Sequence, residues 1–454
     1  MVADVSQSQG DEQNDKVSQD EPGGLSSRSA ALKIISSVLD KGQAFDHVLE
    51  ADSAFHALDI KDRAFVRMMV ATLLRRLGQI DDLITQIEDC QSTKTPALQN
   101  ILRLGVVQIM FMAVADHAAV DTAVRLCDDH GYSRQKGFVN AVLRNIARQG
   151  PALLAKQDEV RLNTPEWLLK TWIADYGLGE AAEIARANLQ EASLDITIKN
   201  EADRNHYASV FKATELLTGT LRKSTGGRVQ DLDGFDKGDW WVQDASAAIP
   251  AQLFGELKGK VVVDLCAAPG GKSVQLASRG ADVVALDRSA KRLKRVEENA
   301  ARLGLSEKIE IHVADAAAWQ PPGSLQYILL DAPCSATGTV RRHPDVLHLK
   351  SERDISRLAD TQTRILNNAF EILAVGGVLV FCTCSLQKDE GERRIEAFLA
   401  RYENAARVPI SAKDDLNGYD ESLTDLGDLR ILPHHQASIG GMDGFFISRL
   451  TKLY

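Results

Sequence analysis

The sequence has few cysteines, no long hydrophobic run and no excess of positive charge. Its 454 residues include six cysteines, too few and too unevenly placed for a disulfide framework, so we expect free thiols in a reducing cytoplasm. No segment approaches the ~18–20 apolar residues that cross a bilayer, and the first 27 residues contain no apolar block typical of a signal peptide. These absences argue against a membrane protein and against an exported one.

The charge balance also limits the function. The 53 basic and 63 acidic side chains give a net charge of −10, so the chain as a whole has no positive field with which to coat nucleic acid non-specifically. A local basic surface is compatible with this balance.

The hydrophobic pattern divides the chain into four parts. Residues 1–27 have hardly an apolar side chain and are predicted to be a disordered tail. Residues 28–150 repeat apolar side chains at three- and four-residue steps and show no strand pattern, which predicts an all-α domain. Residues 151–240 mix helical signals with short alternating stretches and are predicted to form a small α/β linker domain. Residues 241–454 alternate short apolar runs with helix-length segments, which predicts an α/β domain with a parallel sheet.

Polar side chains follow the predicted parallel strands at 261–265, 283–286, 309–313, 327–330 and 378–381. The first strand ends in Asp264 and runs into a glycine-containing loop. The next three are followed by Asp287, Asp315 and Asp331-Ala-Pro-Cys334, and the last leads to Cys382-Thr-Cys384. One such aspartate is more often a helix cap or a turn former. Ligands bind beyond the carboxyl ends of parallel strands, however, so five such ends in series predict one shared crevice.

The glycine loop Cys266-Ala-Ala-Pro-Gly-Gly-Lys272 fits neither common phosphate-binding motif. Cys266 occupies the position where a P-loop has its first glycine, and the G-x-G-x-x-G dinucleotide fingerprint is absent. The tight glycine turn is followed about 16 residues later by Asp287, roughly where an acidic side chain accepts the hydroxyls of a ribose. The spacing favours an adenosine cofactor without phosphates, for which S-adenosylmethionine is the obvious candidate, over a nicotinamide dinucleotide.

Several motifs resemble those of a known family. Asp331-Ala-Pro-Cys334-Ser-Ala-Thr-Gly338 and Thr383-Cys384-Ser385 look like the two cysteine motifs of RNA 5-methylcytosine methyltransferases of the Sun/NOL type, and the glycine loop looks like their cofactor loop. The similarity covers about residues 240–450 and includes Val242-Gln-Asp-Ala-Ser246, Arg341-Arg-His-Pro344 and Asp443-Gly-Phe-Phe446. The helical domain resembles NusB at Asp62-Arg63, Ile101-Leu-Arg-Leu-Gly105 and Gly137-Phe-Val-Asn-Ala-Val-Leu-Arg144.

The resemblance implies a Rossmann-like class I methyltransferase domain that methylates carbon 5 of a cytosine with S-adenosylmethionine. A NusB-like domain ahead of such a domain is the arrangement of an enzyme that modifies cytosine 967 of 16S rRNA, which implies 16S rRNA as the partner. We expect no metal, and we expect the protein to act as a monomer.

The resemblance makes Cys384 the nucleophile, Cys334 a group that assists product release, and Asp331 a ligand of the cytosine edge. It assigns Asp287 to the ribose and Asp315 to the adenine amino group. The residues that would line the cofactor are Cys266, Ala267, Ala268, Pro269, Gly270, Gly271, Lys272 and Asp331.

The sequence contains further arginines and cysteines with predicted roles, and it allows alternative functions. Arg341 and Arg342 follow the Cys334 loop and are predicted to hold an RNA phosphate. Cys90, Cys127 and Cys382 are predicted to be small buried hydrophobic residues, and the one-residue spacing of Cys382 and Cys384 is not that of a zinc pair. An alternative function is an RNA-binding assembly or antitermination factor with a vestigial catalytic domain. A dehydrogenase is disfavoured by the missing dinucleotide fingerprint.

Overall fold

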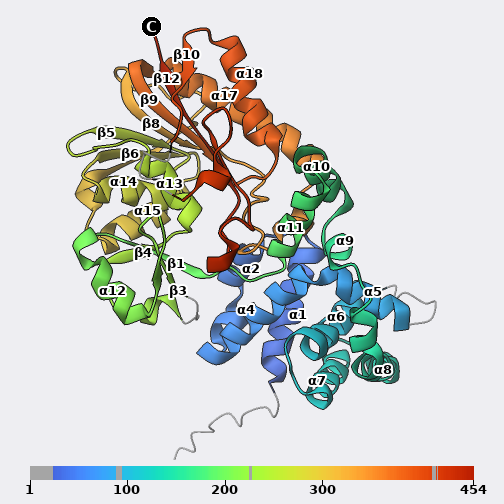
Figure 1. Cartoon of the computed structure of the whole chain (residues 1–454). Coiled ribbons are helices and arrows are strands. Elements are labelled where there is room, and N and C mark those ends of the chain that lie inside the picture. The colour runs from blue at the N-terminus through green and yellow to red at the C-terminus, as the bar shows by residue number, and fades with distance from the viewer. Residues whose placement is uncertain (1–23, 88–94, 224–227, 412–415, 417) are drawn as a thin grey trace, which may run out of the picture.

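The computed structural model describes residues 24–87, 95–223, 228–411, 416 and 418–454. An all-helical domain at the N-terminus lies beside a helical and sheet-containing linker and a larger α/β domain (Figure 1). The part of the chain that the structure describes contains no helix long and apolar enough to span a membrane.

In the described residues, the helical domain contains eight α-helices: α1 (Leu25–Leu39), α2 (Phe45–Ala51), α3 (Ser53–Ala57), α4 (Ile60–Arg75), α5 (Leu77–Ile87), α6 (Pro96–Phe111), α7 (Asp116–Asp129) and α8 (Lys136–Leu154). Helix α4 begins where the Asp59 carboxylate accepts the N–H of Asp62 at 2.7 Å, as an N-cap does. Its buried Val66, Met69 and Leu73 recur at three- and four-residue steps and join one core with the other helices.

Both ends of this domain differ from the predicted ones. Helix α1 begins at Leu25, so residues 25–27 of the predicted tail are helical, and Leu25 and Ser27 are buried. Residues 1–23 lie outside the described residues. At the other end, α8 continues through Pro151 to Leu154. A proline in the last turn of a helix removes few backbone hydrogen bonds, so Gly150-Pro151 does not end the helix here.

The linker contains four helices and a small antiparallel sheet. Its elements are α9 (Glu159–Asn163), α10 (Glu166–Tyr176), α11 (Leu178–Asn188), β1 (Leu194–Ile198), α12 (Arg204–Phe211), β2 (Thr214–Glu215), β3 (Leu221–Lys223) and β4 (Trp240–Val242). The strand order is β2-β3-β1-β4. Strand β4 pairs with β1, so this sheet extends to Val242, two residues past the predicted boundary.

The last part of the chain has the predicted Rossmann-like arrangement. Its elements are α13 (Ala245–Gln252), β5 (Val261–Leu265), α14 (Gly271–Ser278), β6 (Asp282–Asp287), α15 (Ala290–Arg302), β7 (Ile309–Val313), β8 (Leu325–Asp331), α16 (Val346–Leu349), α17 (Glu352–Glu371), β9 (Leu373–Thr383), α18 (Glu392–Arg401), β10 (Ala405–Arg407), β11 (Leu429–Ile431) and β12 (Phe445–Lys452). The five predicted strands are present and parallel, in the order β9-β8-β5-β6-β7. Strand β12 was not predicted; it pairs antiparallel with β9 and makes the sheet mixed.

Helices cover both faces of the sheet. Neighbouring residues of a strand point to opposite faces, so one strand contributes side chains to two cores. Val262 of β5 packs in one core with α13, α14 and α15, whereas Val263 packs in another with α17 and α18. Strands β5, β6 and β7 proceed in one direction across the sheet, and β8 and β9 proceed in the other. The direction changes between β5 and β8, and a ligand crevice is expected beyond the carboxyl ends of these two strands.

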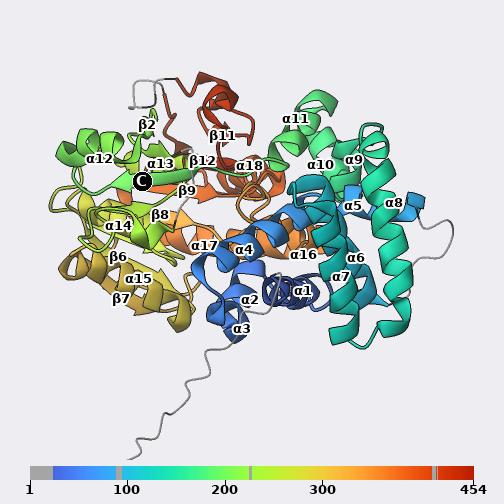
Figure 2. The same ribbon diagram turned by 90° about the horizontal axis from the view of Figure 1, so that it is seen from below.

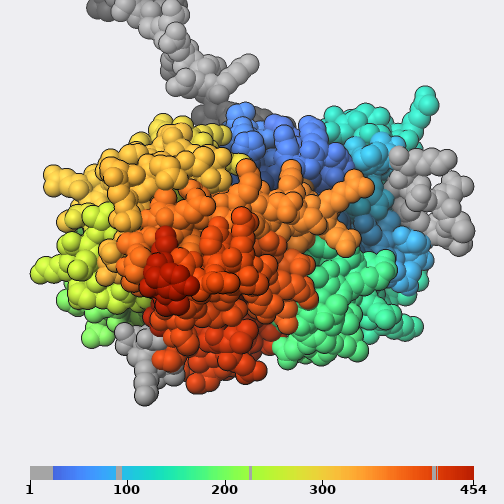
Figure 3. Space-filling view, turned by 90° about the horizontal axis from the view of Figure 1, so that it is seen from above, coloured from blue at the N-terminus to red at the C-terminus, as the bar shows by residue number. Residues whose placement is uncertain are grey.

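The helical domain contacts the loop that follows the first cysteine motif. The N–H of Phe45 donates to Asp345 at 3.0 Å, Arg75 Nη2 donates to the carbonyl of Arg341 at 2.7 Å, and His348 Nε2 lies 2.8 Å from the carbonyl of Leu74. Seen from below, α4 lies beside α16, which it contacts through Leu74 and His348 (Figure 2). In the space-filling view, the blue helical domain lies against the yellow and orange parts of the α/β domain (Figure 3).

Candidate active site

The two cysteines meet at the edge of the sheet between β8 and β9. Cys334 follows β8 in the loop, Cys384 follows β9, and their Sγ atoms are 3.4 Å apart. The N–H of Gly338 donates to the carbonyl of Cys384 at 3.0 Å and joins the loops through the backbone. A Cβ at Gly338 would lie 2.0 Å from the carbonyl oxygen of Gly444, so only glycine fits this position.

Cys334 lies in an environment that disfavours its thiolate. The hydrogen bond with Cys384 and the burial of the side chain raise the pKa of Cys334 well above that of an ordinary thiol. Either sulfur can donate the hydrogen bond that joins the pair. A cysteine acts as a nucleophile through its thiolate rather than its thiol.

An ion pair lies beside the cysteines. Lys272 Nζ, in the first turn of α14, is 2.7 Å from Asp331 Oδ2 at the end of β8. Burial of Lys272 opposes its charge, but the Asp331 carboxylate outweighs this effect and raises the pKa of Lys272. Cys382 Sγ approaches the other oxygen, Asp331 Oδ1, at 3.6 Å. The segments at the ends of β5, β8 and β9 thus bring a cation, a carboxylate and the thiols of Cys334 and Cys384 into one place.

The glycine loop turns tightly between β5 and α14. Cys266 has φ +65° and Gly270 has φ +105°, both in the left-handed region. A Cβ on Gly270 would lie 3.1 Å from Val296 Cγ1 of α15, so a larger residue would be both strained and crowded. Burial raises the pKa of Cys266, so this thiol stays neutral and contributes packing within the loop.

Asp287 and Asp315 lie at the ends of β6 and β7, on the same edge of the sheet. Asp287 is buried; its Oδ1 accepts the N–H of Ser289 at 2.9 Å, and its Oδ2 lies 3.2 Å from Arg292 Nη1 without accepting a hydrogen bond from the described residues. A buried carboxylate oxygen with a free lone pair fits the hydroxyl donors of a ribose. Asp315 is exposed, and its Oδ1 accepts the N–H of Ala317 at 3.0 Å. These residues fit the predicted adenosine cofactor.

Asp264, the penultimate residue of β5, is a buried acid and one of the four aspartates predicted to meet at the strand ends. Ser273 Oγ donates to its Oδ2 at 2.5 Å, and its Oδ1 has no partner among the described residues. Burial raises the pKa of Asp264 to about 7, and the nearby Asp331 and Asp287 add to this effect. Through its hydrogen bond with Ser273, Asp264 joins β5 to α14, the helix that follows the glycine loop.

The raised pKa of Asp264 makes stability depend on pH. The unfolded chain releases this proton near pH 4, whereas the folded protein holds it to about pH 7, so ionisation costs folding free energy between these values. Asp264→Asn should therefore gain stability relative to the unmodified protein by up to about 1.4 kcal/mol per pH unit from pH 5 to 7, and the gain should level off above pH 7. Urea unfolding at several pH values measures the difference. Asp282→Asn, an exposed acid of β6 paired with Lys308, should show no such trend. Parallel pH curves for both variants would contradict this expectation.

Arg341 and Arg342 correct a prediction. Arg341 is 4% exposed, and its Nη2 donates to the carbonyl of Gly440 at 2.6 Å. Arg342 forms ion pairs with Asp244 at 2.8 Å, with Asp443 at 2.9 Å and with Asp195 at 3.6 Å. The predicted contact with an RNA phosphate is wrong, because both guanidinium groups already bind protein oxygens that join the linker to the α/β domain.

The remaining cysteines take the predicted structural role where they are described. Cys127 and Cys382 are fully buried in hydrophobic cores. Cys90 lies outside the described residues.

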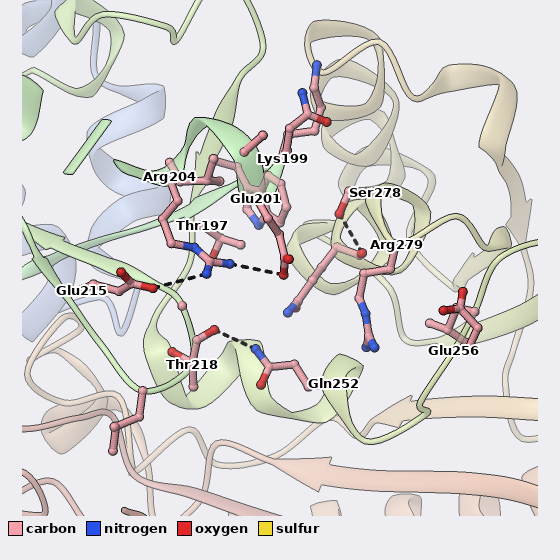
Figure 4. A pocket seen from close by; sticks show the side chains of 18 of the residues that line it. Thr197, Lys199, Glu201, Arg204, Glu215, Thr218, Gln252, Glu256, Ser278 and Arg279 are labelled. Carbon is pink, nitrogen blue, oxygen red and sulfur yellow. Dashed lines mark hydrogen bonds and ion pairs between the residues drawn. The ribbon is translucent and has the colours of Figure 1, made fainter. Parts of the chain in front are cut away.

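A separate cavity of about 750 Å³ lies between the linker sheet and the α/β domain (Figure 4). Thr197 and Lys199 line one side, and Gln252, Ser278 and Arg279 line the other. Gln252 Nε2 donates to the carbonyl of Thr218, and Ser278 Oγ donates to that of Gln275. The predicted site residues do not line this cavity, and Gln252 joins the α/β domain to the linker there through Thr218.

The fold and the site define a Rossmann-like methyltransferase domain joined to a NusB-like helical domain. A family model described as NusB family matches residues 25–148, and one described as 16S rRNA methyltransferase RsmB/F matches residues 252–451. The chain is 35% identical over 403 residues to ribosomal RNA small subunit methyltransferase B of Xanthomonas campestris pv. campestris, covering 86% of this chain and 91% of the relative. It is 34% identical over 450 residues to the protein of that name from Klebsiella pneumoniae (strain 342), covering 94% and 98%. The chain belongs to the family of ribosomal RNA small subunit methyltransferase B, which confirms the resemblance seen in its motifs.

Solved structures share the fold. The crystal structure of PH0851 superposes with a TM-score of 0.74 at 22% identity and covers 95% of this chain and 99% of its own. The structure of NSun6 from Pyrococcus horikoshii with SFG gives a TM-score of 0.55 at 20% identity, covering 64% of this chain and 98% of its own. At these sequence identities, the structural similarity establishes that this chain shares the fold of both proteins.

Proposed function

We propose that this protein transfers a methyl group from S-adenosylmethionine to carbon 5 of cytosine 967 in 16S rRNA, in the cytoplasm. The observation that carries the proposal is the cysteine pair at 3.4 Å beside the Lys272–Asp331 ion pair. The family supports ribosomal RNA as the substrate, since the relatives named above are ribosomal RNA small subunit methyltransferases.

The chemistry explains why the site needs a thiolate. Carbon 5 of cytosine is a weak nucleophile, because the aromatic ring gives it little electron density. When Cys384 forms an Sγ–C6 bond, the ring loses aromaticity and carbon 5 becomes enamine-like, able to attack a methyl group. After methylation, the carbon 5 proton must leave to a base, and its bonding electrons then expel Cys384 as the C6–Sγ bond breaks. Thiolate suits both steps because it attacks well and leaves well.

The neighbouring groups fit defined tasks. Cys334 lies against the sulfur that forms the adduct, so we assign it to product release, either as the base or through a water molecule. The Asp331 carboxylate, held by Lys272, is an acceptor suited to the amino edge of cytosine. Residues 266–272, Asp287 and Asp315 would hold the cofactor. When bound, S-adenosylmethionine supplies an electrophilic methyl group.

The direct test is methyl transfer by the purified protein. We expect incorporation of about one labelled methyl group per unmodified 16S rRNA, in naked transcript or in a small-subunit assembly intermediate, with bisulfite sequencing locating it at cytosine 967. A transcript with uridine at this position should accept no label. Label at another cytosine would overturn the assigned position. RNA binding without methyl transfer to either substrate would instead favour the assembly-factor alternative.

A further inference from the structure

A buried carboxylate lies behind the cysteine pair. Glu390 ends the short 3-10 turn Lys388–Glu390 between β9 and α18 and is fully shielded from solvent. Its Oε1 accepts the backbone N–H of Ser335 at 2.9 Å and Nε2 of Gln362 at 3.1 Å. Its Oε2 accepts the hydroxyls of Ser335 and, at 2.6 Å, of Ser385. One side chain therefore receives four hydrogen bonds.

The two serines that donate to Glu390 are the residues next to the two cysteines. Ser335 directly follows Cys334, and Ser385 directly follows Cys384. The two serine hydroxyls are also 3.0 Å apart, and Thr383 Oγ1 donates to the backbone carbonyl of Glu390 at 3.1 Å. Glu390 thus joins two loops that lie about fifty residues apart in sequence, at the residues adjacent to the reactive sulfurs.

The environment of Glu390 is costly for a charge. Within the described residues, no lysine, arginine or histidine forms an ion pair with it, and burial raises its pKa. A buried carboxylate without a cation is destabilising unless hydrogen bonds replace its hydration. Four hydrogen-bond donors point at the Glu390 carboxylate, so the surrounding loops are arranged to hold this side chain. Fully satisfied buried networks of this kind hold their members in one arrangement.

We propose that Glu390 is a positioning residue that holds the Cys334 loop against the Cys384 loop and keeps the two sulfurs within reach of each other. Glu390 touches neither sulfur and acts through Ser335 and Ser385. The inference deepens the proposed function and rests on it for the catalytic consequence. The spacing of the thiols is a property of the protein alone and can be measured without RNA.

Phenylarsine oxide is a suitable probe of the spacing, because its arsenic condenses with two neighbouring thiols to form two As–S bonds and one water molecule. We expect the full-length protein to bind it at Cys334 and Cys384, detected by intact mass and by protection of both cysteines from alkylation. Cys334→Ala gives the background. Glu390→Ala should weaken binding at least tenfold, because the loops lose their common anchor. Glu390→Gln keeps the Oε1 acceptor and the shape, and the serine hydroxyls can rotate to accept from its amide, so it should retain most of the binding.

The catalytic readout separates positioning from general stability. In methyl transfer, Glu390→Ala should lower kcat about 100-fold, as a displacement of about 1 Å in an active site does, with unchanged KM values for RNA and S-adenosylmethionine. Glu390→Gln should restore most of kcat. If Glu390→Ala does not fold, Ser385→Ala removes one of the two links and should give a smaller loss of both arsenical binding and kcat.

Asp428→Ala is the matched control. Asp428 is a buried carboxylate paired with Arg407 at 3.1 Å and, within the described residues, forms no hydrogen bond or ion pair with either cysteine loop. Its loss should destabilise the protein without changing arsenical binding. The proposal is wrong if Glu390→Ala binds the probe and turns over like the unmodified protein, or if Asp428→Ala shows the same losses. If the unmodified protein binds the probe but transfers no methyl group, the proposed function fails while the positioning role stands.

Discussion

Replacing Cys334 with alanine should leave the protein covalently attached to its RNA. In this variant Cys384 can still form the Sγ–C6 bond, but the group assigned to product release is absent. Loss of general acid–base assistance typically slows a step by about 10²–10⁴-fold, so the adduct should accumulate. A denaturing gel after incubation with S-adenosylmethionine and unmodified 16S rRNA should show a slowly migrating protein–RNA band that protease removes.

Companion variants identify the nucleophile. Adding Cys384→Ala to Cys334→Ala should abolish the band, and Cys384→Ala alone should remove methyl transfer. Cys127→Ala, at a buried cysteine of the helical domain, should turn over normally and form no band. If Cys334→Ala forms no adduct while the unmodified protein methylates RNA, the assigned division of labour between the two cysteines is wrong.

Removing Arg342 should destabilise the folded protein by about 3–5 kcal/mol, the range seen when one partner of a buried ion pair is lost. Its guanidinium joins Asp195 of β1, Asp244 at the start of α13 and Asp443 before β12. Burial already raises the pKa of Asp443 to about 6 even with Arg342 beside it. Without Arg342, Asp443 and Asp244 lose their closest cation, while Asp195 keeps its pair with Arg222 at 2.7 Å.

Urea unfolding of Arg342→Ala at pH 8 measures the loss. The variant should regain part of its stability as the pH falls from 8 towards 6, because removal of Arg342 raises the pKa of Asp443 further and protonation then removes an unpaired charge. Arg357→Ala, at an exposed arginine paired with Asp354 in the same helix, should change the free energy of unfolding by no more than about 0.5 kcal/mol. A loss below about 1 kcal/mol in Arg342→Ala would mean that the three carboxylates do not depend on this cation.

The motifs at the strand ends could be interpreted from the sequence because they depend on local order. Apolar runs stop where strands stop, and parallel strands present their carboxyl ends to one edge, so Asp287, Asp331 and Cys384 could be placed together before any coordinates. Strand β12 was not predicted because the prediction relied on strands that alternate with helix-length segments. The sequence before β12 lacks this alternation, and the strand pairs antiparallel with β9.

The arginines at 341 and 342 show the opposite case. Two consecutive arginines beside a substrate-binding motif are a fair signal for phosphate contact. Nothing in their neighbours in sequence reveals that Arg341 is buried or that Arg342 pairs with buried carboxylates. Their partners are provided by segments about 100 to 150 residues away. Such contacts leave no periodicity in the local sequence.

The sequence by itself therefore determined the class of fold, the cofactor loop and the two candidate cysteines, because each depends on residues close together in the chain. Only the tertiary structure decided that the sulfurs lie 3.4 Å apart, that Lys272 pairs with Asp331, that Glu390 joins both loops, and that Arg342 pairs with buried carboxylates. The physical reason is that these contacts join side chains from distant segments, and their free energies depend on burial, which arises only when the cores have packed.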